Sequence, residues 1–194
     1  AKILMNVAHG PEWLSKDKKL SPADEDRFAK LCGELVRVMR DEVKVPVAYW
    51  EMTNEYDNTY ENAGKLDDLW RLFNKIAKEV KRVDPKAKVG GPALTWPKGI
   101  WLEGFLKNCG QNIDFFTWHN YASGDLYDSN EHVLSRTETI ANMARDAVNA
   151  AKKYVPNKKL EMFLTEYNIK WVWDPVELRH GNNIGAVFHA STLR

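Results

Sequence analysis

The stretch "VPVAYWEMTNEYD", Val45 to Asp57, combines a strand pattern with a group of polar residues at its end. Its first part is apolar and rich in β-branched and aromatic residues, which is typical of a strand covered by other elements. The run ends in Asn54 and Glu55, and a second acid, Glu51, lies four residues earlier. Because a carboxylate is costly to bury, the position of Glu55 at the end of a covered strand needs a reason.

Strands and helices alternate on both sides of this stretch. Strands are expected over residues 3–7, 45–52, 87–94, 113–121 and 159–169, and helices over residues 21–43, 66–84, 99–110, 129–155 and 181–194. Strict alternation predicts an α/β fold with a parallel sheet and outer helices. Since no linker or repeat interrupts the pattern, we expect residues 1–194 to form one domain.

The composition excludes several classes of protein. Of the 194 residues, 44% are hydrophobic and 28% are charged, and a net charge of +1 gives no reason to expect nucleic acid or an anionic membrane as a partner. No apolar run approaches the ~18 residues of a membrane span. Cys32 and Cys109 are expected to be buried, reduced thiols, with a single disulfide bridge between them as the alternative. There is no signal-peptide pattern, and both an extracellular and a cytoplasmic location stay open.

The polar and aromatic residues collect where the expected strands end. In chain order these residues are Asn6, His9, Asn54, Glu55, Thr95, Trp96, Trp118, His119, Tyr121, Glu166 and Tyr167. The carboxyl ends of parallel strands carry the functional site in α/β folds, including the β/α barrel. We therefore expect Glu55 and Glu166 to face each other across the mouth of a barrel.

Two facing carboxylates suit the cleavage of a glycosidic bond. One of them protonates the leaving oxygen, while the other attacks the anomeric carbon in a retaining enzyme or activates water in an inverting one. A nearby carboxylate and an apolar wall raise the pKa of one acid, and hydrogen bonds keep the other ionised.

Three segments resemble clan A glycoside hydrolases, whose fold is a (β/α)8 barrel. "YWEMTNEYD" resembles the fourth strand with its acid/base, "IDFFTWHNY" the sixth strand with its His-x-Tyr, and "MFLTEYN" the seventh strand with its nucleophile. The resemblance is closest to family 39, the β-xylosidase type, and family 51-like arabinofuranosidases are the alternative. It implies a retaining β-glycosidase that acts on oligo- or polysaccharide, favours β-xylosides and needs no cofactor.

The resemblance also assigns roles to residues. It implies that Glu55 is the general acid/base and Glu166 the nucleophile. Asn54 would hydrogen-bond the sugar 2-hydroxyl, Tyr121 would orient Glu166, and His119 would line the pocket near the acid/base.

Further substrate contacts are expected around this centre. His9 matches a frequent substrate contact of the family, and Trp96 and Trp118 are candidate platforms for stacking on a sugar. The rim of the cleft is expected to include Trp13, Trp171 and Trp173. Glu51 is expected to be structural, either bonded inside the barrel or ion-paired.

The chain departs from the family pattern in two ways. The Pro that often follows the acid/base is Tyr56 here. The five strands would correspond to strands three to seven, so we expect a partial barrel with two unpaired edges, a fragment that self-associates or needs a complementary fragment. The alternative function is a non-catalytic carbohydrate-binding remnant.

A metal or phosphate site is not expected. The sequence has no His-x-x-x-His or His-Glu-x-x-His helix and no cysteine ligand set. The acidic stretch "DLYDSNE", Asp125 to Glu131, lacks the glycine and spacing of a calcium loop. Gly90 and Gly91 precede a proline and read as a strand-end turn.

Overall fold

The computed structural model describes residues 1–14, 20–125, 127–172 and 177–194. Its strands are β1 (Ile3–Val7), β2 (Val47–Met52), β3 (Val89–Leu94), β4 (Phe115–Ser123) and β5 (Glu161–Lys170). Its helices are α1 (Pro22–Val38), α2 (Tyr56–Asn62), α3 (Leu66–Val83), α4 (Gly99–Cys109), α5 (Asn130–Tyr154) and α6 (Asn183–Thr192), with a π-helical turn η1 (Met39–Val43) and 3₁₀ turns η2 (Gly110–Asn112) and η3 (Leu178–Gly181).

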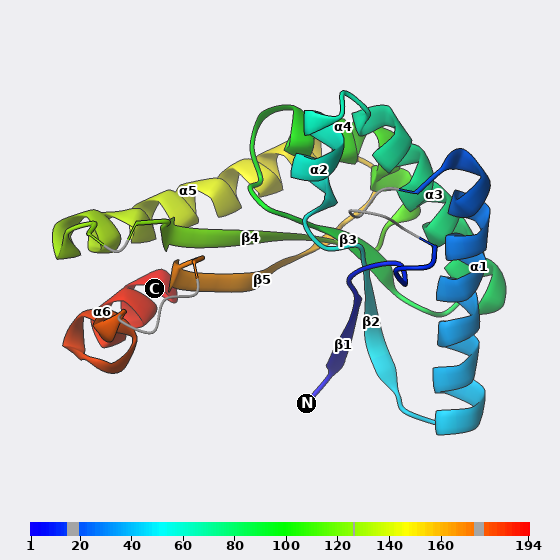
Figure 1. Ribbon diagram of the computed structural model, residues 1–194, viewed down its shortest axis with the longest axis horizontal. Helices are drawn as coiled ribbons and strands as arrows, with labels where there is room; N and C mark the ends of the chain where they lie inside the picture. The colour runs from blue at the N-terminus through cyan, green and yellow to red at the C-terminus, as the bar shows by residue number, and fades with distance from the viewer. Residues whose placement is uncertain (15–19, 126, 173–176) are drawn as a thin grey trace.

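The five strands form one parallel sheet in the order β1-β2-β3-β4-β5. The sheet is curled, with α1, α3 and α4 along its outer side, while β4 and β5 extend with α5 and α6 as an arm (Figure 1). Each crossover passes through helical segments, as parallel neighbours require. The predicted α/β fold, a partial (β/α) barrel of five parallel units, is confirmed.

The main core lies between the sheet and the outer helices. The apolar side of α3 is buried there, and Leu69, Phe73 and Ile76 are each 0% exposed. From the sheet, Trp50 and Met52 of β2 belong to the same cluster. Burial of each such side chain contributes about 1.5–3 kcal/mol, so this layer holds the outer helices on the sheet.

The inner face of the sheet carries the alternate residues of the strands, because successive side chains of a strand point to opposite faces. Tyr49 of β2 packs edge-on against Phe115 of β4 at 5.3 Å and against Phe163 of β5 at 5.1 Å, measured between ring centroids. The hydroxyl of Tyr49 donates to Glu161 Oε2 over 2.6 Å. These contacts close the inner face between β2 and β5 near the start of β5.

Helix α1 begins with Ser21 as the N-cap residue and proline at the first helical position. The hydroxyl of Ser21 donates to Asp24 Oδ2 over 2.6 Å and does not cap a backbone N–H. Cys32 and Cys109 are buried and unpaired, as predicted. Across the described ranges, no helix has both the length and the hydropathy to cross a membrane.

Candidate active site

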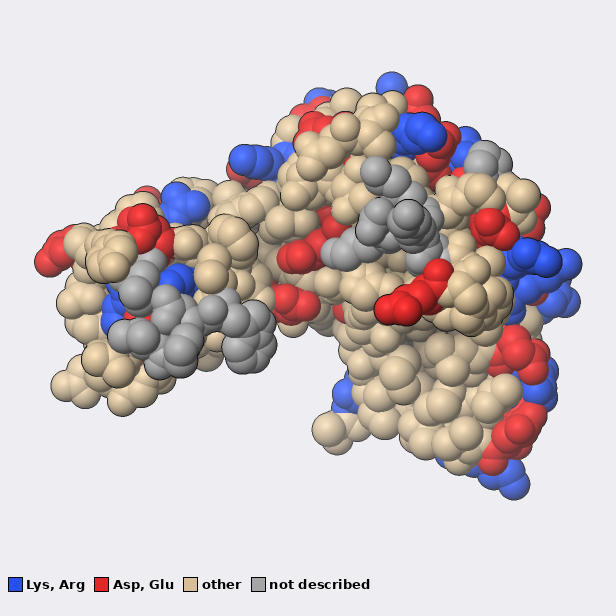
Figure 2. Space-filling model, in the orientation of Figure 1, with Lys and Arg blue, Asp and Glu red and all other residues tan. Residues whose placement is uncertain are grey.

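The carboxyl ends of β2, β3, β4 and β5 surround a cleft of about 530 Å³. Figure 2 shows acidic side chains in the hollow where the β4–β5 arm meets the rest of the molecule. The residues that line the cleft are Glu55, Asn58, Thr59, Thr95, Trp96, Tyr121, Glu166 and Trp171. Both predicted catalytic acids therefore lie on one cleft, at the predicted end of the sheet.

Glu55 is positioned by an irregular turn that follows β2. Thr53 and Glu55 both have left-handed backbone conformations, with φ of 68° and 54°, which cost a non-glycine residue about 1–3 kcal/mol each. Backbone hydrogen bonds hold the turn: Thr53 N donates to Val7 O over 3.1 Å, and Glu55 N donates to Ala93 O over 3.0 Å. The turn is thus fixed to both neighbouring strands, and it brings the Glu55 side chain into the cleft.

Glu166 is positioned by a bulge in β5. Leu164 pairs with Trp118, and Glu166 pairs with His119, so Thr165 is an extra residue in the β4–β5 ladder. A bulge re-aims the side chains next to it, and bulges are common beside active sites. Here the bulge places Glu166 in the cleft.

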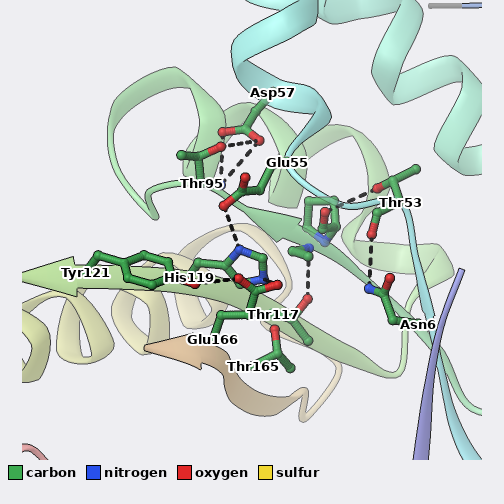
Figure 3. A network of polar contacts seen from close by, with 12 residues as sticks. Asn6, Thr53, Glu55, Asp57, Thr95, Thr117, His119, Tyr121, Thr165 and Glu166 are labelled. Carbon is green, nitrogen blue, oxygen red and sulfur yellow. Dashed lines mark hydrogen bonds and ion pairs between the residues drawn. The ribbon is translucent and has the colours of Figure 1, made fainter. Parts of the chain in front are cut away.

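His119 lies between the two carboxylates (Figure 3). Its Nδ1 is 2.8 Å from Glu55 Oε1, and its Nε2 is 3.5 Å from Glu166 Oε1. The side chain of His119 is 1% exposed, against 30% for Glu55 and 43% for Glu166. The imidazole is therefore a buried bridge between two carboxylates that solvent and ligands can reach.

The same three residues bring ligand-type atoms within 4.8 Å of one another. Among the described residues this trio is the group that could hold a metal ion. Zinc would need the nitrogen and both oxygens at about 2.0–2.2 Å from one point. Because Nδ1 of His119 is already engaged with Glu55, the arrangement as it stands is suited to sharing a proton.

Tyr121 completes the group from the same face of β4. Its hydroxyl donates to Glu166 Oε2 over 2.7 Å. Burial, together with this hydrogen bond to Glu166, raises the pKa of Tyr121 above its ordinary value of 10.0. The phenol therefore stays a hydrogen-bond donor to Glu166 at neutral pH, the contact expected of an orienting residue.

Glu51 lies below the cleft on the inner face. It is 2% exposed, accepts from Asn6 Nδ2 over 2.6 Å and accepts from Thr165 Oγ1 over 2.9 Å. This acid thus connects β1, β2 and the bulge of β5. Its position agrees with the predicted structural role inside the barrel.

The remaining predicted contacts differ in position. Trp96 is half-buried and lines the cleft. Asn54 is half-buried beside Glu55 and is not among the described residues that line the cleft. His9 stacks on Tyr56 with 5.8 Å between ring centroids and is not among the lining residues. Trp171 lines the cleft, Trp13 does not, and Trp173 lies outside the described residues.

The prediction for Trp118 is wrong. Its side chain is 3% exposed and belongs to the core between the sheet and the outer helices. It stacks on Phe116 with 5.8 Å between ring centroids. The physical reason is strand alternation, since His119 points to the inner face and its chain neighbour must point to the opposite one.

Sequence reasoning missed Asp57, which lies in the first turn of α2. Asp57 is 1% exposed and accepts from Thr95 N over 3.1 Å and from Thr95 Oγ1 over 3.3 Å. Burial raises the pKa of Asp57 from 3.8 to about 6, and the nearby carboxylate of Glu55 adds to the rise. The sequence does show an acid two residues after Glu55, but helix α2 is too short to give a periodic pattern from which the burial of Asp57 could be predicted.

Comparisons with known proteins identify relatives of this chain. The family model "Glycosyl hydrolases family 39" matches residues 28–193. Beta-xylosidase of Geobacillus stearothermophilus is 28% identical over 155 residues, which are 74% of this chain and 30% of the relative. Beta-xylosidase of Caldicellulosiruptor saccharolyticus is 28% identical over 152 residues, 76% of this chain and 31% of the relative. The chain thus spans about 30% of the length of these relatives.

A solved structure, the glucosidase of Croceicoccus marinus, matches with a TM-score of 0.68 and 24% identity. The match covers 99% of this chain and 39% of that one, and at this identity it shows a shared fold alone. The family match, in contrast, extends over most of the chain and includes both carboxylates of the cleft. The chain therefore belongs to glycosyl hydrolases family 39.

Proposed function

We propose that this chain carries the catalytic face of a retaining β-glycosidase, with Glu166 as nucleophile and Glu55 as general acid/base. The observation that carries the proposal is the approach of one oxygen of each carboxylate to within 4.8 Å. Retaining enzymes keep the two carboxyl groups about 5–5.5 Å apart, whereas inverting enzymes separate them by about 6.5–9.5 Å to admit a water. The two beta-xylosidase relatives favour a β-xyloside substrate.

Hydrogen bonding supports this division of roles. The phenol of Tyr121 donates to Glu166, which holds the orientation of the carboxylate that would attack. His119 Nδ1 is in hydrogen-bond contact with Glu55 Oε1, while its Nε2 faces Glu166 Oε1 from 3.5 Å. The double displacement requires a protonated acid at Glu55 and a carboxylate at Glu166.

The reaction then runs in two displacements. Glu166 attacks the anomeric carbon while Glu55 gives its proton to the leaving oxygen, and a glycosyl-enzyme forms on Glu166. Glu55 next takes a proton from water, the hydroxide oxygen bonds to the anomeric carbon, and Glu166 is released. Asn54, which is half-buried beside the acid/base, would bind the sugar 2-hydroxyl.

We expect full activity to require closure of the sheet. β1 and β5 pair with a single described strand each, and much of β5 is half-exposed. Catalytic groups need ångström-level positioning, and Glu166 lies on the half-exposed β5. A complementary fragment that supplies further strands, or self-association at these edges, would cover β5 and restrict the motion of Glu166.

Covalent trapping tests the assignment. The chain, alone and mixed with a fragment supplying the remaining strands of a relative, is incubated with an activated 2-deoxy-2-fluoro-β-xyloside. The intact mass should rise by one fluorosugar, and peptide mapping should place it on Glu166. Glu55→Ala should still be labelled by an aryl donor with a good leaving group and should recover turnover with azide, while Glu166→Ala should take no label. Labelling at another residue, or parental rates in both variants, would refute the assignment.

A second candidate is a non-catalytic carbohydrate-binding protein. The 43% exposure of Glu166 favours it, because water at an open site weakens the electrostatics on which catalysis depends. Calorimetry separates the two functions. Sugar binding without turnover, both in the chain alone and in the mixture, would favour the binding protein.

A further inference from the structure

One ring nitrogen of His119 faces a carboxylate without bonding to it. The side chain is 1% exposed, and within the described ranges its Nε2 has no hydrogen-bond partner. This nitrogen lies 3.5 Å from Glu166 Oε1, on the side of the ring away from Glu55 (Figure 3). Because buried polar atoms are almost always paired in folded proteins, the orientation of Nε2 needs an explanation.

The distance between the two atoms fits a shared metal ion. A nitrogen that donates a hydrogen bond lies about 2.7–3.2 Å from its oxygen acceptor. Two ligands that each lie about 2.1 Å from a tetrahedral Zn²⁺ ion are about 3.4 Å apart. The observed 3.5 Å between His119 Nε2 and Glu166 Oε1 is close to the second value, so the pair is spaced as two ligands of one ion.

Each of these ligand atoms belongs to a group that is held from its other side. His119 Nδ1 lies 2.8 Å from Glu55 Oε1, and a metal-bound histidine almost always donates its other ring N–H to such an acceptor. Tyr121 donates to Glu166 Oε2 over 2.7 Å, so Oε1 is the oxygen that faces Nε2. A proton on Nδ1 leaves the lone pair of Nε2 directed toward Glu166. Proton sharing with Glu55 and metal binding therefore use different nitrogens of the ring.

Glu55 is in reach as a third ligand. Its ligand oxygen lies within 4.8 Å of those of His119 and Glu166, so a shift of about 1–1.5 Å would give it the spacing of ligands on one tetrahedral ion. Its side chain is 30% exposed, and both glutamates line the cleft, through which an ion can enter. Two carboxylates balance the charge of a divalent ion. The imidazole nitrogen favours Zn²⁺ over Mg²⁺ and Ca²⁺, which prefer oxygen ligands.

We propose that His119, Glu166 and Glu55 bind one Zn²⁺ ion, and that the bound ion blocks the cleft as an inhibitor. With both carboxylates engaged by the metal, neither can attack a sugar or give it a proton. Metal binding does not depend on the proposed function, whereas the inhibitory effect rests on it. The three ligands come from the ends of different strands and form no motif, which is why the sequence predicted no metal site. Binding of Zn²⁺ at a surface histidine is the competing explanation.

Calorimetry with Zn²⁺ tests the site on the chelator-treated chain. The chain should bind one equivalent of Zn²⁺, at least about tenfold more tightly than Mg²⁺. Glu166→Gln keeps the size of a half-exposed side chain and should lose at least tenfold in Zn²⁺ affinity. His119→Gln should lose at least as much. Both variants are compared with the parent only where their circular dichroism spectra are native.

Co²⁺ gives a second readout that needs no activity. Four-coordinate Co²⁺ absorbs visible light far more strongly than the hydrated ion, so these bands should appear in the parent and be lost in Glu166→Gln. His132→Ala is the matched control, because His132 is a 47% exposed histidine with Nε2 3.8 Å from Asp128 Oδ2. It should bind Zn²⁺ as the parent does.

Unchanged Zn²⁺ affinity in Glu166→Gln and His119→Gln would overturn the proposal, and so would the absence of binding or its loss in His132→Ala. Zn²⁺ should also slow covalent labelling of Glu166 by the fluoroxyloside, and a chelator should restore the rate. Labelling of Glu166 at an unchanged rate with Zn²⁺ bound would overturn the inhibitory role. Failure of the proposed function looks different, since the chain would then bind Zn²⁺ through Glu166 and His119 while the fluorosugar labels another residue or none.

Discussion

Replacement of Asp57 by Asn should stabilise the protein at neutral pH. The carboxyl is 1% exposed, and burial raises its pKa from 3.8 to about 6. A raised pKa in the folded state means that the folded protein holds the proton more tightly than the unfolded chain does. The group therefore costs no stability below about pH 3.8, and its penalty grows as pH rises and is complete above about pH 6.

The size of the effect follows from the shift. A difference of about two pKa units, at about 1.4 kcal/mol per unit, is a penalty of about 3 kcal/mol at pH 7. In Asp57→Asn the Oδ1 can still accept from Thr95 N, and the amide can donate to Thr95 Oγ1. The variant thus removes a buried charge and keeps its hydrogen-bonding positions.

The assay is urea unfolding of both proteins from pH 4 to pH 8. The difference in unfolding free energy between variant and parent should increase by about 2 kcal/mol from pH 4 to pH 7, because part of the penalty is already present at pH 4. Any hydrogen-bond strength that the amide loses shifts this difference equally at every pH. Asp67→Asn is the control, because Asp67 is an exposed acid in the first turn of α3 and its replacement should change stability by less than about 1 kcal/mol. A difference for Asp57→Asn that does not vary with pH would refute the reasoning.

Two further predictions concern the scaffold. Gly90→Ala should destabilise the protein by about 1–3 kcal/mol, because the new Cβ would lie 2.3 Å from Phe115 O. Gly181→Ala is the control and should leave the stability unchanged, because no atom lies within 4 Å of a Cβ at that position. Urea unfolding measures both variants. Cys32 and Cys109 should stay unreactive toward a thiol reagent at pH 8 and both react in urea, because burial raises the pKa of each thiol to about 12. Rapid labelling of the folded protein would show that one thiol is accessible.

The sheet and the location of the site could be predicted from the sequence. Strand–helix alternation implies parallel strands, and parallel strands end at one edge, so Glu55 and Glu166 had to share that edge. Strand alternation, if applied to the fourth expected strand, would also have corrected the prediction that Trp118 contacts the substrate. His119 and Tyr121, two residues apart on one strand, share a face, and Trp118, the residue directly before His119, must point to the opposite face.

Other features could not be predicted, because no periodic pattern encodes them. Helix α2 is too short to show an apolar stripe, so the burial of Asp57 against Thr95 had no signal. The contact between the Trp171 indole and the Gly124 backbone depends on the exact pairing of β4 with β5. Such contacts arise from packing between elements, which one sequence does not record.

The two irregularities that aim the carboxylates follow a common logic. In regular strands, the side chains of Glu55 and Glu166 would follow the strict alternation of their neighbours and would not both point into the cleft. The left-handed turn redirects Glu55, and the extra residue Thr165 redirects Glu166. Each irregularity is held by a hydrogen bond to another strand: Glu55 N donates to Ala93 O of the adjacent β3, and Thr165 Oγ1 donates to Glu51 of β2 across the inner face. Backbone strain persists where surrounding structure over-determines it. The buried network around Glu51 therefore supports the geometry of the cleft as well as the stability of the sheet.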